Sequence, residues 1–173
     1  MNLKTILLVF VGSASAIYAQ SNPLTTELKG NYSNIKNTIL RGAEKMPEAD
    51  YTFKPAPESR TFGAVVTHIA QIQIMLCAAA KGETKQADDS KTSKADAVAF
   101  LKESIDYCDP VYEGLTDTSA MQMAKMFGRD RTKFGILDFN VIHDNEMYGT
   151  MAVYLRAKGL VPPSSEGRGG GKK

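Results

Sequence analysis

The chain has 173 residues, of which 43% are hydrophobic and 23% are charged, and this composition excludes both a disordered chain and a bundle of membrane-spanning helices. Its 21 basic and 19 acidic residues give a formal charge of +2. The positive excess comes from the two ends of the chain. Without Lys4 and the last ten residues, which carry three basic and one acidic side chain, 17 basic and 18 acidic residues remain. The body of the chain therefore gives no electrostatic reason to expect a nucleic-acid partner.

The first 19 residues resemble a secretory signal peptide. Lys4 provides a positive start, residues 6–11 are apolar, and small residues lead to an acceptable cleavage site after Ala19. The apolar run is much shorter than the roughly 20 residues of a spanning helix, and no later segment is expected to span a membrane. We therefore expect residues 1–19 to be removed and the protein to be exported, to a bacterial periplasm or the medium, without a membrane partner. An uncleaved anchor is the alternative.

Residues 20–163 are expected to form a single all-α domain, a four-helix bundle. The first helix is predicted from about residue 23 to 46, where Pro47 stops an amphipathic stripe. An extended connection with two prolines leads to Thr61, the expected N-cap of a second helix that ends before Gly82.

The third helix is predicted from Ser93, in a variant of the capping box, to about residue 115. Residues 116–131 are ambiguous, because they are long for a loop and interrupted for a helix. The fourth helix is predicted over residues 132–158, with an inner side made of Ile136, Phe139, Ile142, His143, Met147, Met151 and Tyr154. The Gly-rich basic segment 164–173 is expected to be a disordered tail.

The chain has two histidines, His68 and His143, and each lies in the middle of an otherwise apolar helix face. A lone core histidine is usually satisfied by a hydrogen bond, which is the simpler interpretation of each one alone. Two inward histidines on different helices favour a shared site, because bundles build metal sites from side chains on facing helices. His68 and His143 are therefore candidate metal ligands.

Several stretches of the chain resemble the DinB-like superfamily of four-helix bundles. They are Thr67-His68-Ile69-Ala70, the segment Ile142 to Gly149, the Tyr154-Leu155-Arg156 ending that leads to Pro162-Pro163, and the linker from Met46 to Pro55. The resemblance implies an up-down-down-up topology. It also implies metal ligands at His68 and His143, with a third at the position of Met147, where the metal-binding members have histidine. Activities assigned in the superfamily include thiol-dependent transferases and isomerases.

Because Met147 departs from the family pattern, three functions remain open. In the first, His68, His143 and Glu146 bind a divalent zinc, nickel or manganese ion, and the protein is a hydrolase or thiol transferase acting on an unidentified small molecule. In the second, the site has been lost and the exported bundle is non-catalytic. In the third, His68, His143 and Met147 bind copper, assisted by a methionine-rich segment with Met121, Met123 and Met126. A homodimer is compatible with all three.

Cys77 and Cys108 are an even pair in a chain that is expected to be exported, which favours a disulfide. In a plain hairpin of the second and third helices, the two residues differ in height by roughly 16 Å, too much for a bridge. In a parallel arrangement of these helices they lie level. The resemblance implies the parallel arrangement and hence a Cys77–Cys108 disulfide, with two buried thiols as the alternative.

Overall fold

The computed structural model describes residues 22–167, so the expected signal peptide lies outside the described residues. Four long helices form the bundle: α1 (Pro23–Lys45), α2 (Phe62–Lys81), α3 (Lys94–Glu113) and α5 (Lys133–Ala157). Five short elements occupy the connections: 3₁₀ helices at Glu48–Asp50 and Pro163–Ser165, α4 (Asp117–Ala120), and strands β1 (Met123–Met126) and β2 (Arg129–Thr132). The predicted all-α four-helix bundle is confirmed.

Local sequence signals set the ends of the long helices. The side chains of Thr61, Ser93 and Thr132 each accept a hydrogen bond from the backbone three residues later, and so begin α2, α3 and α5. Gly82 ends α2 with a left-handed φ of 81°, a conformation that costs glycine little. These short-range signals explain why the predicted helix bounds lie within two residues of the observed ones.

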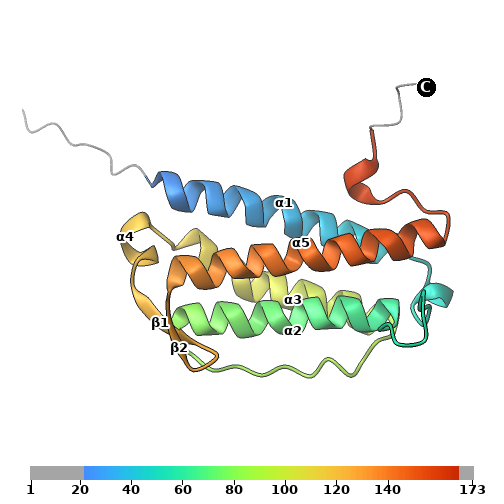
Figure 1. The fold of residues 1–173 in the computed structure, drawn as a ribbon, viewed down its shortest axis with the longest axis horizontal. Helices are drawn as coiled ribbons and strands as arrows, with labels where there is room; N and C mark the ends of the chain where they lie inside the picture. The colour runs from blue at the N-terminus through green and yellow to red at the C-terminus, as the bar shows by residue number, and fades with distance from the viewer. Residues whose placement is uncertain (1–21, 168–173) are drawn as a thin grey trace, which may run out of the picture.

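The helices follow an up-down-down-up course. α2 and α3 run in the same direction, opposite to α1 and α5, and residues 82–93 return along the length of the bundle between them (Figure 1). The end of this returning segment presses against Gly63, where an added Cβ would lie 2.1 Å from the carbonyl oxygen of Thr92. The topology implied by the family resemblance is therefore confirmed.

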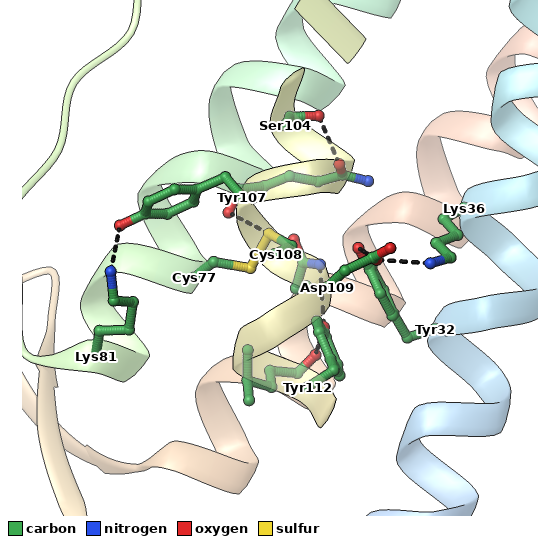
Figure 2. Close-up of a disulfide and its surroundings, with 12 residues drawn as sticks. Tyr32, Lys36, Cys77, Lys81, Ser104, Tyr107, Cys108, Asp109 and Tyr112 are labelled. Atoms are coloured by element: carbon green, nitrogen blue, oxygen red, sulfur yellow. Dashed lines mark hydrogen bonds and ion pairs between the residues drawn. A yellow bond between two sulfur atoms is a disulfide. The ribbon is translucent and has the colours of Figure 1, made fainter. Parts of the chain in front are cut away.

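A disulfide joins α2 to α3. Cys77 and Cys108 are fully buried, and their Cα atoms are 5.5 Å apart, because the parallel course of the two helices brings them level. Figure 2 shows the bridge, with Asp109 on the next position of α3 turned toward Tyr32 and Lys36 of α1. The predicted pairing is confirmed, and such a bond is typical of proteins from an oxidising compartment.

The ambiguous segment 116–131 contains α4, β1 and all but the last residue of β2, and the two strands form a β-hairpin at the end of the bundle where α2 ends (Figure 1). β1 and β2 pair antiparallel, with Met123 opposite Thr132 and Met126 opposite Arg129. The two turn residues, Phe127 and Gly128, have φ values of 51° and 76°, as a two-residue turn matched to the strand twist requires. The hairpin contacts α2 and α5 at this end of the bundle.

The structure describes residues 164–167, which follow the end of the domain predicted from the sequence at residue 163. The Tyr148 hydroxyl donates to the hydroxyl of Ser164 at 3.0 Å and accepts from the Ser164 amide at 2.9 Å. Glu166 forms ion pairs with Arg41 and Lys45 of α1. Residues 164–166 thus contact the bundle, and residues 168–173 of the expected tail lie outside the described residues.

Among residues 22–167, α2 is the one helix long and apolar enough to cross a membrane by length and composition alone. No such segment was expected after the leader. In the structure, 67% of its most apolar window is buried inside the bundle. The apolar side chains of α2 pack against the neighbouring helices, so the length and apolar composition of α2 are weak evidence for a membrane-spanning segment.

Candidate metal centre

His68 on α2 and His143 on α5 lie next to each other between the two helices. Their ring centroids are 5.3 Å apart, and the ring planes meet at 71°. Two imidazoles that bind one tetrahedral ion at about 2 Å place their ring centroids about 5 Å apart. The observed separation therefore matches that of two ligands of a shared ion.

Both imidazoles are half-buried, and this burial is the main cause that lowers the pKa of each below its ordinary value. The charge of Arg60 lowers the pKa of His68 further, whereas Asp89 raises it. The charge on His68, and then that of Arg60, lowers the pKa of His143 against the opposite effect of Glu146. The site thus favours neutral imidazoles, the form that binds metal ions.

One nitrogen of this pair lacks a partner. Nδ1 of His143 is buried, and it forms no hydrogen bond with any residue in the described part of the chain. Leaving a buried polar atom unsatisfied costs free energy, and such atoms are rare in folded proteins. In the tautomer that leaves Nδ1 unprotonated, this nitrogen has a free lone pair for a metal ion, so the two histidines are compatible with metal binding.

The structure does not complete a three-ligand set. No group of three or more His, Cys, Asp and Glu side chains within residues 22–167 is placed to hold a metal ion. Glu146, the expected oxygen ligand, is exposed and does not form such a group with the histidines. Met147 is half-buried and packs against the core, one turn after His143. Of the expected ligands, the structure brings His68 and His143 together, and Met147 follows one turn after His143 on α5.

The methionines expected to assist a copper site lie elsewhere. Met121 and Met123 are 60% exposed, and Met126 is buried in β1 at the end of the bundle where α2 ends. His68 lies 13 residues before the end of α2 at Lys81. This is about 20 Å along the helix axis. The methionine-rich segment is therefore not part of the site.

Asp144 directly follows His143 on α5, and its side chain is fully buried and faces Gln73 of α2. Its Oδ2 accepts a hydrogen bond from Gln73 Nε2 at 2.8 Å, and Gln73 Oε1 accepts one from Ser104 of α3 at 2.8 Å. Burial raises the pKa of Asp144 to about 8, although the bond from Gln73 lowers it. A buried polar network thus lies next to the histidines in the chain.

An open hollow of about 560 Å³ adjoins this part of the bundle. It is lined by Glu58, Ser59 and Arg60 of the connection after α1, Val65 of α2, and Met147, Thr150 and Tyr154 of α5. Val65 lies one helical turn before His68, and Met147 one turn after His143. This spacing places the hollow beside the two imidazoles. Of the residues that line the hollow, the sequence predicts only Met147 as a site residue. Arg60 is not predicted, because it belongs to no metal-ligand pattern.

Comparisons with known proteins agree with this fold. A profile described as the DinB superfamily matches residues 36–151, which is more than half of the chain. A DinB-like protein from Bacillus cereus has 18% identity and a TM-score of 0.70, over 80% of this chain and 95% of that one. Another, from Bacillus subtilis, has 22% identity and a TM-score of 0.65, over 78% and 93%. No curated protein matches. The chain belongs to the DinB superfamily.

Proposed function

We propose that the protein is a metal-dependent enzyme of hydrolase or thiol-transferase type, in which His68 and His143 bind a divalent zinc, nickel or manganese ion. The observation that carries this proposal is the pair of imidazoles from facing helices, with centroids 5.3 Å apart and Nδ1 of His143 buried without a partner. Such an ion lowers the pKa of a water or thiol and supplies a nucleophile at neutral pH.

The chain's own residues prepare this centre. Burial keeps both imidazoles neutral, so they need not lose a proton before binding a cation. The bond between Gln73 and Asp144 ties α2 to α5 close to the histidines and supports their spacing. Val65 and Met147 add apolar side chains to the lining of the adjoining open hollow.

Met147 supports a second candidate function, a copper(I) site. A thioether is a soft ligand that suits copper(I) better than zinc, nickel or manganese. Met147 is half-buried one turn after His143, in the position where the metal-binding members of the family have histidine. The two candidates differ in the metal they prefer and in their dependence on the sulfur of Met147.

Metal selectivity tests both candidates. Tag-free, metal-stripped protein is equilibrated with zinc, nickel, manganese or copper(I), and the metal retained after desalting is measured. If the protein is the proposed enzyme, the wild type and Met147→Leu should each retain about one equivalent of a divalent metal. If the wild type prefers copper(I) and Met147→Leu loses it, the copper site is supported. Metal-dependent turnover is then measured with a nitrophenyl ester and with a thiol and an aromatic halide; no metal and no turnover leaves the non-catalytic bundle.

Export belongs to the same proposal. The buried Cys77–Cys108 disulfide and the signal-like sequence of residues 1–19 support an oxidising compartment, a bacterial periplasm or the medium. Mass spectrometry of the protein from its native host tests this directly. A mature chain that begins at Gln20 is expected, and an intact Met1 in the folded protein would speak against cleavage.

A further inference from the structure

Arg60 lies at the rim of the hollow with an unpaired charge. Its side chain is exposed and forms no hydrogen bond or ion pair with any other residue that the structure describes. Glu58 lines the same hollow but forms no ion pair with Arg60. Among the residues that line the hollow, Arg60 is the one cation. The guanidinium is therefore available to a ligand.

The backbone of Arg60 is held firmly in place. The Tyr154 hydroxyl donates a hydrogen bond to the carbonyl oxygen of Arg60 at 2.7 Å. The next residue, Thr61, accepts from the amide of Ala64 at 3.1 Å as the cap of α2. The side chain thus starts from a fixed point, and its charge acts on both His68 and His143.

The N-terminus of α2 offers no competing anion site, because its first amides are already bonded. The amide of Phe62 donates to the carbonyl of Phe53 at 3.0 Å, and that of Gly63 to the carbonyl of Tyr51 at 2.9 Å. The amide of Ala64 is bonded to the cap. A ligand anion in the hollow therefore meets one charged donor, the guanidinium of Arg60, and no free helix N-terminus.

This arrangement favours a carboxylate over a phosphate. A guanidinium forms two parallel N–H···O bonds with a carboxylate or with a phosphate, so the other donors in the hollow decide between the two anions. A phosphate, with more charge and more acceptor atoms, is usually held by several donors or a free helix N-terminus. The apolar side chains of Val65 and Met147 in the same hollow suit a ligand with an apolar body.

We propose that Arg60 forms a subsite that binds the carboxylate of a small, partly apolar organic ligand in the hollow beside the histidines. The further step, that this ligand is also the substrate, rests on the proposed function. In that case its carboxylate contacts Arg60 and its other end lies at the proposed metal centre. The contact between Arg60 and the carboxylate needs no metal.

Benzoate is a suitable probe, and the full chain without metal is titrated with it by two-dimensional NMR. Saturable shifts are expected at the amides of Val65 and Thr150 and at the Nε–H of Arg60. Arg60→Gln is expected to weaken benzoate about tenfold, the usual effect of losing a charge-assisted hydrogen bond. Glu58→Gln is the matched control at the same rim, and it should bind benzoate at least as well as the wild type.

Three results would overturn the subsite. They are no saturable shift with benzoate, equal affinity of benzoate for the wild type and Arg60→Gln, and tighter binding of inorganic phosphate or neutral benzamide than of benzoate. Cobalt(II) uptake by the same samples is measured separately, and Arg60→Gln, which keeps both histidines, should still take up cobalt. Arg60-dependent benzoate binding in a chain that takes up no cobalt supports the subsite while removing the proposed metal centre.

Discussion

Gln73 of α2 donates a buried hydrogen bond to the carboxylate of Asp144 on α5, with 2.8 Å between Nε2 and Oδ2. His68 lies five residues before Gln73, and His143 directly precedes Asp144. The same two helices therefore carry the polar bond and the pair of imidazoles. A shift of α2 against α5 would disturb both, so the bond helps to set the spacing at the candidate metal centre.

Asp144→Asn is expected to stabilise the protein at pH 8 and to have little effect near pH 4. Burial raises the pKa of Asp144 to about 8, so the folded protein keeps a proton that the unfolded chain releases above about pH 4. This difference destabilises the wild type increasingly as the pH rises between the two values. Asparagine still accepts from Gln73 and stays neutral. Urea unfolding should show a gain of about 1–3 kcal/mol at pH 8.

The control for this prediction is Asp106→Asn, because Asp106 is an exposed aspartate of α3. It reports the effect of an aspartate-to-asparagine change at an exposed position, with which the gain in Asp144→Asn is compared. A wild type that is as stable as Asp144→Asn at pH 8 would show that the carboxylate is accommodated in its charged form.

Removing the disulfide is expected to lower stability substantially. Cys77 and Cys108 are separated by 31 residues in the sequence. Cross-linking a loop of this length lowers the entropy of the unfolded chain, and in the chain-entropy model this raises the free energy of unfolding by about 3–4 kcal/mol. The double variant Cys77→Ala/Cys108→Ala should therefore unfold at a lower urea concentration than the wild type. Intact mass should rise by about 2 Da on reduction of the wild type. An unchanged mass would mean that the bridge does not form in solution.

Gly63→Ala is expected to destabilise the fold, because a Cβ at this position would lie 2.1 Å from the backbone oxygen of Thr92. The returning segment 82–93 would have to move, at a cost of about 1–3 kcal/mol. Gly30→Ala in α1 is the matched control, since no atom lies within 4 Å of its added Cβ. It should stabilise the protein by up to about 1 kcal/mol through helix propensity. Thermal unfolding of both variants measures the contrast, and equal effects would contradict the close approach.

The sequence predicts the long helices well because their ends depend on neighbouring residues. Thr61, Ser93 and Gly82 act over one helical turn, and the structure shows all three in their expected roles. The hairpin after α4 was not predicted. Its strands have four residues each, and they are held by pairing with each other and by contact with α2 and α5 rather than by a periodic pattern.

The inner face of α5 was predicted only in part. Phe139 and Ile142 are 39% and 55% exposed, whereas Asn140 and Asp144 are fully buried. Periodicity ranks apolar residues as inward and takes no account of polar partners on other helices. The Nδ2 group of Asn140 donates to the Tyr112 hydroxyl at 3.1 Å, and Gln73 bonds Asp144. A polar residue on the otherwise apolar face of one helix, together with similar residues on other helices, is the sequence pattern that indicates a buried polar network.

The most direct test of the metal centre is X-ray absorption at the edge of the bound metal, in tag-free protein loaded with zinc. We expect about one zinc per chain, with a coordination shell that contains two imidazole nitrogens at about 2 Å. The folded His68→Ala/His143→Ala variant should lose this zinc. A wild type without stoichiometric metal, or a bound ion whose shell lacks histidine, would show that the two histidines do not form a metal centre.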